Sequence, residues 1–497
     1  MTVCAEIYPE KNGSEKGSSA LFTDFYSLTM AQGYWKKGMN NRSVFEMYYR
    51  RQPFGGGFSV FTGLGTLLEK LQTLAFTRDD INYLRELAVF EEGFLDYLKD
   101  FRFSGSLWAM EEGTIVFPNE PLVRIDGSLI ECQIIEAMLL NTINFQTLIA
   151  TKTARVWLAS GKGKVVEFGL RRAQGFDGAM SASRAAYIGG ASGTSNMLAG
   201  REYGIPVLGT MAHSWVMAWP GEEEAFSAYA ELYPDSTIFL IDTYDTLKSG
   251  IVNAIKVGKT LAKKGKKFGV RLDSGDIQYL STEVRKRLDA AGLKNAAISV
   301  SNDLDESIIQ ALREADAPVD TWGVGTQMVT GGNEAALSGV YKLAAMAGEN
   351  GELAAKIKFS DNPEKTTTPG LKQVWRIRDT EGMLVADVLS LEDPRNPDLI
   401  EKGKTYTFWH PQGDYRRFSH TLDGSSESML VEHLHNGRHI REESSLKNIR
   451  ERVRCGLESL DQTYKRILNP HIYKVSITEK LRALKLELIK NYLGDLQ

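Results

Sequence analysis

Seven short runs rich in β-branched residues recur between residues 164 and 345, and helical patterns separate most of them. The runs lie at 164–169, 205–210, 236–242, 267–273, 296–302, 319–325 and 339–345. Strands that alternate with helices at this spacing predict parallel βα units. Because the count approaches eight, we expect an α/β fold with an irregular α/β barrel. An open, doubly wound sheet is the alternative.

Polar, charged and glycine-rich residues follow six of these runs directly. The first run leads into "LRRAQG" and the second into "MAHS", the third and fourth end in Asp242 and Asp273, Asp303 follows the fifth, and the sixth closes "GVGT". In an α/β barrel the carboxyl ends of the strands meet at one face, where active sites lie. The pattern therefore predicts a single site built from several loops.

The chain has 497 residues, more than the roughly 250 to 300 residues at which one hydrophobic core stops growing, so several domains are expected. Residues 24–37 have helical spacing, with Asp24 as a capping residue and Gly38 just beyond, and predict one amphipathic helix. We predict a flexible tail at 1–20, an N-terminal α/β domain at 21–140, a barrel domain at 141–360, and a C-terminal region at 361–497 packed on the other two.

Charge and composition argue against several classes of partner. The 59 Lys and Arg residues against 63 Asp and Glu give a net charge of −4, so nucleic acid is not expected. Three scattered cysteines favour a reducing compartment, and the histidines of "HLHNGRH" have no Cys or Asp nearby at ligand spacing. The longest uncharged stretch, "YGIPVLGTMAHSWVMAWPG", contains Gly, Pro and His, which favours a buried strand and loop over a membrane span. We expect a cytoplasmic protein.

The motif "GVRLDSGD" places Arg271 and Asp273 two residues apart, so both side chains point to the same face of a strand. Such a pair can provide a cation for an anionic substrate beside a carboxylate for a cationic or metal-bound one. An internal salt bridge at a strand end is the alternative. The segments "GGASGTSN" and "GVGT" can cradle phosphate with backbone N–H groups, although neither matches a Walker or Rossmann spacing.

His213 is the only histidine in the first 409 residues, and it directly follows a predicted strand. A lone histidine in an apolar run is commonly a core residue with satisfied hydrogen bonds. Its position at a strand end instead favours a ring that titrates, or acts as a nucleophile, near neutral pH.

Seven motifs taken together resemble the nicotinate phosphoribosyltransferase family: "LFTDFYSLTMAQGYWKKG", "EFGLRRAQG", "GTMAHSWV", "LIDTYD", "GVRLDSGD", "VSNDLDE" and "GVGT". Their order and spacing agree from about residue 21 to 376, and "PEKTTTPGLK" and "VSITEKL" extend the likeness toward the C-terminus. The resemblance implies a type II phosphoribosyltransferase fold, in which an irregular α/β barrel joins an N-terminal α/β domain. It also implies a homodimer with active sites at the subunit interface.

The reaction that the resemblance implies joins nicotinate to the phosphoribosyl group of 5-phosphoribosyl 1-pyrophosphate, with release of pyrophosphate, in NAD salvage. ATP is a co-substrate, so the enzyme is placed in the ATP-coupled ligase class, and Mg²⁺ accompanies the diphosphate groups. By resemblance His213 accepts the γ-phosphoryl group of ATP as a phosphohistidine. A neutral imidazole suits this role because it is nucleophilic near pH 7 and forms a labile N–P bond.

Five residues match positions that bind nicotinate in the family. Tyr26 resembles the aromatic residue that stacks on the pyridine ring, across the dimer interface, and Phe168 forms the opposite face. Thr210 and Arg271 match positions that hold the nicotinate carboxylate, where a cation favours the acid over the amide. Arg171 lies near the anionic groups of the ligand on the same resemblance.

Five further residues match positions around the phosphoribosyl group. Asp242 and Asp273 lie beside the ribose or Mg²⁺, where a carboxylate stabilises positive charge that develops at the anomeric carbon. Asn302, Gly325 and Thr326 hold the 5-phosphate in a backbone cradle. The metal ligands themselves are left open.

Three rival functions differ in what they require of the sequence. A nicotinamide phosphoribosyltransferase resembles "DFGYRG" and "GTDT" where this chain has "EFGLRR" and "GTSN", so an Asp able to accept from an amide N–H is missing. A catalytically silent nucleotide-binding protein on the same fold predicts the loss of His213, Asp273 or Arg271, and all three are present. A barrel aldolase requires a lysine for Schiff-base chemistry, and the six polar strand ends offer none.

Overall fold

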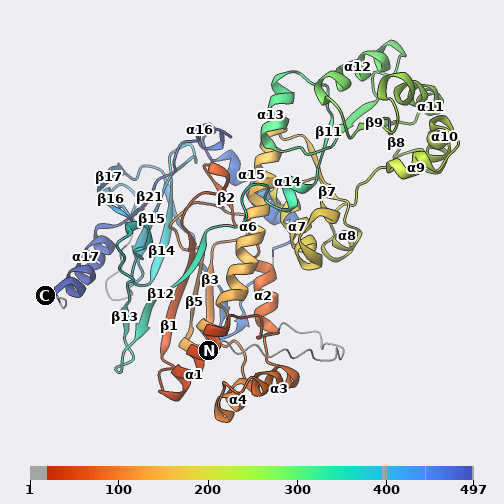
Figure 1. Cartoon of the computed structure of the whole chain (residues 1–497). Helices are drawn as coiled ribbons and strands as arrows, with labels where there is room; N and C mark the ends of the chain where they lie inside the picture. The colour runs from red at the N-terminus through yellow and green to blue at the C-terminus, as the bar shows by residue number, and fades with distance from the viewer. Residues whose placement is uncertain (1–18, 394–397, 399, 443, 495–497) are drawn as a thin grey trace.

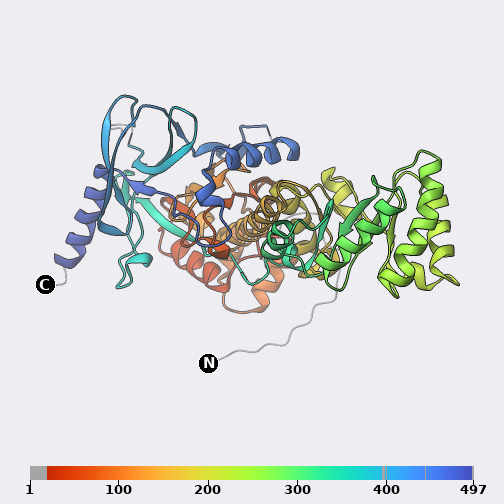
Figure 2. The same ribbon diagram turned by 90° about the horizontal axis from the view of Figure 1, so that it is seen from above.

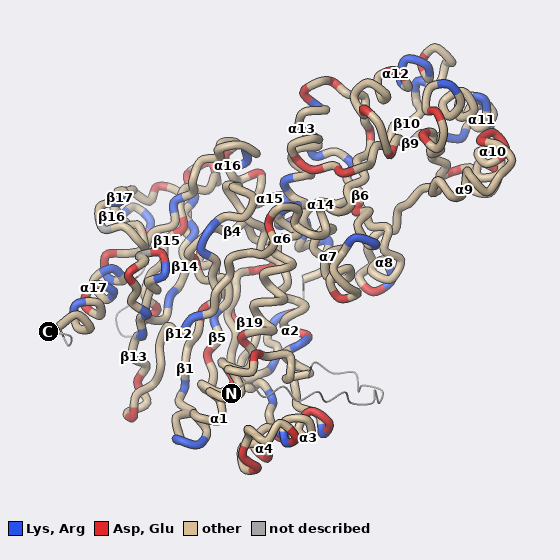
Figure 3. The backbone as a smooth tube through the Cα atoms, in the orientation of Figure 1, with Lys and Arg blue, Asp and Glu red and all other residues tan. Residues whose placement is uncertain are grey.

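The structure is a computed structural model that describes residues 19–393, 398, 400–442 and 444–494, so most of the predicted tail lies outside the described residues. Figures 1 and 2 show an elongated molecule with a helix-rich α/β body at one end and C-terminal strands at the other. Charges of both signs are spread along the chain (Figure 3), as the small net charge requires. None of the helices in the described ranges combines the length and the apolar character that a bilayer crossing needs.

Six parallel strands form the sheet of the α/β body, in the order β7-β6-β11-β10-β9-β8. Their bounds are β6 Lys164–Glu167, β7 Gly193–Thr194, β8 Ile238–Leu240, β9 Gly269–Leu272, β10 Ala297–Val300 and β11 Thr321–Val324. The helices of this body are α7 Gly175–Gly189, α8 Met197–Tyr203, α9 His213–Met217, α10 Glu222–Leu232, α11 Ile251–Lys263, α12 Ile277–Ala290, α13 Glu306–Glu314 and α14 Thr326–Val329. The predicted βα units are confirmed.

The strand order follows that of a barrel rather than that of an open, doubly wound sheet. Apart from β7 and β8, which lie at the two ends of the sheet, strands that are consecutive in the sequence are neighbours, and the last strand, β11, pairs with the first, β6. Beyond β7 the ladder continues only through a bridge between Thr194 and Val207. Within the described residues no hydrogen-bonded pair joins this bridge to β8, so the barrel is irregular at that point.

Two of the seven predicted strands differ from the expectation. The run at 205–210 contributes only the bridge at Val207, because Pro206 has no N–H group and its carbonyl alone bonds, accepting from Thr194. The run at 339–345 does form a strand, β12 (Gly339–Ala347), but in another sheet, antiparallel to β1 (Arg42–Tyr49). The prediction that it belongs to the barrel was wrong, since β-branched composition identifies a strand but not its partner.

The second sheet has seven strands in the order β13-β12-β1-β5-β3-β19-β20 and draws them from all three predicted regions. Its remaining bounds are β3 Ser106–Ala109, β5 Val123–Ser128, β13 Leu353–Ala355, β19 Val431–His435 and β20 Arg438–His439. The N-terminal helices are α1 Phe25–Lys36, α2 Leu64–Gln72, α3 Arg78–Glu86, α4 Glu92–Lys99 and α5 Leu129–Ile134. The predicted helix at 24–37 is therefore confirmed as α1, with Asp24 in the N-cap position.

The C-terminal region builds a third sheet, in the order β17-β16-β21-β15-β14-β18. Its strands are β14 Lys372–Arg378, β15 Leu384–Leu391, β16 Thr405–His410, β17 Gly413–Thr421, β18 Ser425–Ser428 and β21 Val475–Ile477. Three helices accompany it: α15 Leu446–Glu458, α16 Gln462–Lys465 and α17 Glu479–Gly494. A short pair, β2 Ser59–Val60 and β4 Ile115–Val116, completes the strands of the described chain.

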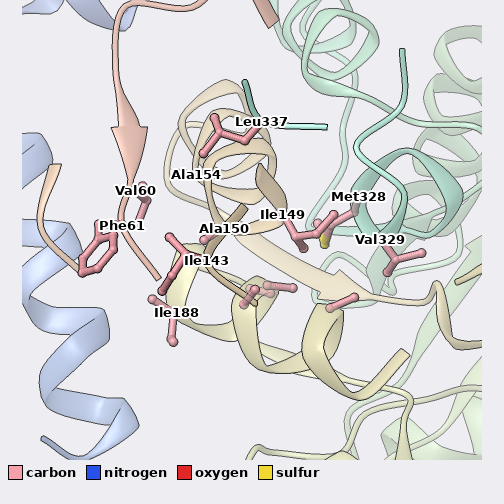
Figure 4. Packing of buried hydrophobic residues seen from close by; sticks show 14 of the residues in the cluster. Val60, Phe61, Ile143, Ile149, Ala150, Ala154, Ile188, Met328, Val329 and Leu337 are labelled. Atoms are coloured by element: carbon pink, nitrogen blue, oxygen red, sulfur yellow. The ribbon is translucent and has the colours of Figure 1, made fainter. Parts of the chain in front are cut away.

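The 24-residue helix α6 (Glu136–Ala159) joins the α/β body to the second sheet, and most of its residues are buried. Its apolar side chains point to all sides, as a helix surrounded by protein requires. Figure 4 shows Ile149 facing Met328 of α14, while Ile143 and Ala150 lie toward Val60 and Ile188. The predicted boundary at residues 140 and 141 falls inside this helix.

Candidate active site

Arg271 on β9 is the centre of a hydrogen-bond network at the carboxyl ends of the strands. Its Nε donates to Ser301 Oγ at 2.8 Å, Nη1 to Thr210 Oγ1 at 2.8 Å, and Nη2 to Asp273 Oδ1 at 2.7 Å. The two-residue spacing does place Arg271 and Asp273 on one face. All three guanidinium nitrogens have partners, so the side chain is held in a single orientation.

Two carboxylates, Asp242 after β8 and Asp273 after β9, lie next to each other in this network. The backbone N–H of Asp273 donates to Asp242 Oδ2 at 2.8 Å, and Ser274 Oγ donates to the same oxygen at 2.6 Å. Burial opposes the ionisation of Asp273, but the hydrogen bond from Ser301 and the charge of Arg271 outweigh it and hold the pKa below its ordinary value. Asp273 is therefore a carboxylate at neutral pH.

One carboxylate oxygen of Asp242 is available to a ligand. Its Oδ1 is buried and has no hydrogen-bond partner among the described residues. A buried carboxylate oxygen without a donor is costly unless a ligand hydroxyl or a cation completes it. In the described part of the chain no group of three or more His, Cys, Asp or Glu side chains is arranged to hold a metal ion. A metal at Asp242 would thus take most of its ligands from substrate or water, as Mg²⁺ commonly does.

His213 begins α9, and its ring contacts residues that follow both carboxylate-bearing strands. Its Nδ1 lies 3.1 Å from Thr243 Oγ1, and its Nε2 lies 3.6 Å from Asp273 Oδ2. The side chain is 39% exposed, so the ring is not a core histidine. Thr243, which directly follows Asp242, fixes the ring by a hydrogen bond at one nitrogen and leaves the other free to face the carboxylate.

A cavity of about 300 Å³ lies in front of this network. Its lining includes Phe168, Arg171, Thr210, His213, Arg271 and Asp273. The guanidinium carbon of Arg271 lies 5.4 Å from the centre of the Phe168 ring, which is within cation–π range. The cavity thus presents one aromatic face, cations, a carboxylate and an imidazole to a small ligand.

The turn that carries Phe168 and Arg171 is held from beneath by Glu167, the last residue of β6. The fully buried Glu167 carboxylate accepts from the Gly169 N–H and from the hydroxyls of Ser183 and Thr194. At Gly169 a Cβ atom would lie 2.3 Å from a methyl carbon of Val329, so only glycine fits. Arg171 follows in the short 3₁₀ helix Leu170–Arg172 and is exposed at the rim.

The predicted phosphate residues lie at the same edge of the sheet but outside the lining of the cavity. Asn302 follows β10, is exposed, and has a φ of 96°. Gly325 lies between β11 and α14, and Thr326 begins α14; both are next to the Phe168 turn, because β11 pairs with β6. At Gly325 a Cβ atom would lie 3.2 Å from the Phe168 carbonyl oxygen. The three residues therefore occupy neighbouring strand ends.

Tyr26 is not part of this cavity. It lies on α1, which packs on α5 at the end of the molecule away from α9 and β9 (Figure 1), and it is 47% exposed. Sequence reasoning assigned no role to Ser301, Thr243 or Glu167, although all three lie inside motifs that it quoted. Their signal was the presence of a hydroxyl or carboxylate at a strand end.

Comparisons with known proteins identify the family of the chain. Models of the nicotinate phosphoribosyltransferase (NAPRTase) N-terminal domain, family and C-terminal domain match residues 21–144, 163–386 and 371–485. The chain is 41% identical to the nicotinate phosphoribosyltransferase of Bacillus subtilis (strain 168), over 96% of each chain, and 31% identical to that of Homo sapiens, over 97% of this chain and 98% of the relative.

The crystal structure of human nicotinic acid phosphoribosyltransferase is similar to the whole fold. It superposes with a TM-score of 0.82 at 30% identity, covering 94% of this chain and 99% of that one. Sequence, fold and site geometry lead to one conclusion: the chain belongs to the nicotinate phosphoribosyltransferase family.

Proposed function

We propose that the chain transfers the phosphoribosyl group of 5-phosphoribosyl 1-pyrophosphate to nicotinate, forming nicotinate mononucleotide and pyrophosphate for NAD salvage, with ATP hydrolysis coupled to the transfer. The observation that carries the proposal is the fixed Arg271 beside Phe168 in a cavity that also contains His213 and Asp273. Membership of the family supplies the substrates, and the cavity offers a complementary group for each of them.

Nicotinate binding follows from the donors of the cavity. Arg271 and Arg171 supply positive charge to the carboxylate, and the Thr210 hydroxyl lies 2.8 Å from the Arg271 guanidinium. The Phe168 ring provides an apolar face for the pyridine ring. An amide in the same place would present its N–H₂ group to these cations, so the acid binds more tightly.

The phosphoribosyl transfer develops positive charge at the anomeric carbon as the bond to pyrophosphate breaks. Asp273, ionised at neutral pH, stabilises that charge, and Asp242 orients it through the Asp273 N–H. Asp242 Oδ1 and Asp273 would hold Mg²⁺, which when bound neutralises the charge of the diphosphate. Asn302, Gly325 and Thr326 hold the 5-phosphate at the neighbouring strand ends.

ATP coupling is assigned to His213. In the tautomer in which Nδ1–H donates to Thr243, Nε2 carries the lone pair and attacks the γ-phosphorus of ATP. The bond from phosphorus to the bridging oxygen breaks, ADP leaves, and water later hydrolyses the N–P bond to release phosphate. Arg271, held by Asp273 beside the ring, supports the charge of the transferred group.

A second copy of the chain completes the aromatic sandwich. Tyr26 cannot serve its own cavity, yet α1 exposes Phe25 at 59% and Tyr26 at 47%. Near the cavity, Phe176 and Met197 are also exposed, at 75% and 70%. Large apolar side chains that are left in water favour contact with a partner surface. We therefore assign a homodimer in which Tyr26 of one copy faces Phe168 of the other.

The choice of base tests the proposed function. Purified protein is supplied with 5-phosphoribosyl 1-pyrophosphate, Mg²⁺ and ATP, and the products from nicotinate and from nicotinamide are separated and quantified. We expect nicotinate mononucleotide and pyrophosphate in equal amounts, and little product from the amide. A larger yield from nicotinamide would overturn the substrate, and binding of nicotinate without product would favour a silent binding protein.

A further inference from the structure

A cavity of about 710 Å³ lies at the opposite end of the parallel strands from the active site. Its walls come from the C-terminal ends of α6 and α13, which lead into β6 and β11, and from the segment around α16. Figure 1 shows these elements together at the top of the molecule, away from α8 and α9. We call this cavity the basic cleft.

Four cations line the basic cleft: Lys162, Arg313, Lys465 and Arg466. The carboxylate in its lining is Glu314, whose Oε1 accepts from Gln310. Within the described residues no ion pair is recorded for Arg313, Lys465 or Arg466. The cleft therefore carries an excess of positive charge on a protein whose net charge is −4.

The ammonium groups of Lys162 and Lys465 lie close enough to repel each other. Burial lowers the pKa of the Lys465 ammonium, and the charge of Lys162 lowers it further, while Asp461 and Glu458 only partly offset both effects. Lys162 lies 3.6 Å from Glu458, but that carboxylate is closer to Arg454, at 2.6 Å. An anion that binds between Lys162 and Lys465 relieves the remaining repulsion between them.

Three of these cations also donate a hydrogen bond to a backbone carbonyl near the end of a helix. Arg313 Nη1 donates to the Ala159 carbonyl at the end of α6, at 3.2 Å, and Lys465 Nζ donates to the Leu457 carbonyl at the end of α15, at 2.8 Å. Such contacts stabilise helix C-termini. Each uses one donor, however, and a guanidinium has five N–H groups and an ammonium three. Arg466 Nε donates to the Thr463 carbonyl in the short helix α16, at 3.3 Å and exposed to solvent, and Lys162 Nζ contacts Glu458 instead.

An apolar wall stands beside these cations. Leu158, Ala159, Ile467 and Leu468 contribute to it, and Leu468 is 81% exposed. Gly161 allows the Arg313 guanidinium to pack directly on the backbone, because a Cβ atom there would lie 2.5 Å from the guanidinium carbon. Cations beside an apolar wall, in a space of several hundred Å³, are complementary to a ligand that carries phosphate groups as well as an apolar ring.

We infer that the basic cleft is a second ligand site, separate from the active site, and that it binds a nucleoside diphosphate. The diphosphate lies among Lys162, Arg313, Lys465 and Arg466, and the nucleoside lies against Leu158 and Leu468. Pyrophosphate alone would leave the apolar wall in water, and a nucleoside alone would leave the cations unneutralised.

Hydrogen exchange measured by mass spectrometry tests this site on the full chain, because it distinguishes the two sites by peptide. The probes are ADP, pyrophosphate and adenosine. We expect ADP to slow exchange in peptides that cover 158–163 and 461–468, pyrophosphate to do so about tenfold less tightly, and adenosine not to do so. Peptides around 209–213 and 271–276 report the active site separately.

The test variant is Lys162→Gln with Arg466→Gln, which keeps the two cations that cap α6 and α15 and loses only the exposed contacts of Lys162 with Glu458 and of Arg466 with Thr463. Its matched control, Lys259→Gln with Lys263→Gln on α11, removes the same charge from an exposed face elsewhere. We expect ADP to bind the basic cleft at least about tenfold more weakly in the test variant and unchanged in the control. Equal protection in both variants, no protection of 461–468 by ADP, or equal binding of adenosine would overturn the inference.

Discussion

Ser301→Ala is the most informative single substitution at the active site. Ser301 is 4% exposed; its hydroxyl accepts from Arg271 Nε at 2.8 Å and donates to Asp273 Oδ1. The Ser301 hydroxyl thus orients the Arg271 guanidinium and also favours the ionised form of Asp273. The substitution removes that oxygen without changing any group that we assign to substrate contact.

The expected magnitude follows from the two lost hydrogen bonds. A hydrogen bond to a charged group contributes about 1.5 to 3 kcal/mol. The two bonds share one hydroxyl and are not additive, so we take about 2 kcal/mol for the pair. At about 1.36 kcal/mol for each tenfold change, kcat/KM for nicotinate falls roughly 30-fold. The KM for nicotinate rises more than that for the phosphoribosyl donor, because Arg271 loses its orientation.

The pH dependence gives a second readout. Folding lowers the pKa of Asp273, so its contribution to stability is present above the unfolded pKa and is lost as the pH falls through the folded value. Without the Ser301 bond the folded pKa moves back toward the ordinary value. The acid limb of kcat/KM therefore moves to higher pH in the variant.

Steady-state kinetics across the acid range measure both effects, and Ser281→Ala is the matched control. Ser281 is a fully buried serine on α12 whose hydroxyl donates to the Gln278 carbonyl, and it is not part of the cavity lining. We expect Ser281→Ala to change the free energy of unfolding but neither KM nor the pH profile. A Ser301→Ala protein with the parent's KM and acid limb would refute the network that we describe.

Three further predictions concern other parts of the site. Arg271→Lys keeps the charge but loses the three-way hydrogen bonding, so kcat/KM for nicotinate should fall about a hundredfold in steady-state assays, and a change below about threefold would contradict the role. Glu167→Ala leaves the buried Gly169 N–H without its acceptor and removes one acceptor of the Ser183 and Thr194 hydroxyls, so it should lower the free energy of unfolding by about 3 kcal/mol in urea titrations; an unchanged midpoint would show that the turn is held in another way. Tyr26→Ala mixed with Arg271→Lys should recover activity in about a quarter of the sites after subunit exchange, whereas no recovery would argue against shared sites.

The sequence was sufficient to predict the place of a side chain in the sheet where that place depends only on the periodicity of the strands. The spacing of Arg271 and Asp273 placed both on one face of β9, and the series of βα units placed His213, Asp242 and Gly325 at one edge of the sheet. These inferences need only the period of two along a strand and the common direction of parallel strands.

Other features depend on contacts between distant segments, which no local pattern encodes. Ser301 and Thr243 became visible only when β10 and β8 were placed beside β9. β12 pairs with β1, almost 300 residues earlier, so the sheet to which β12 belongs could not be predicted from its composition. The proposed role of Tyr26 requires a second copy of the chain, and the fully buried Glu167 is recognisable only by its three donors.

The central claim is that His213 couples ATP hydrolysis to nicotinate mononucleotide formation. The most direct test measures that product with and without ATP, for the parent and for His213→Ala, after thermal unfolding shows that both proteins are folded. We predict that ATP stimulates the parent and that the stimulation disappears in the variant, while basal transfer persists. Equal stimulation of both proteins would contradict the phosphohistidine, and the ring would then have only its contacts with Thr243 and Asp273 to explain it.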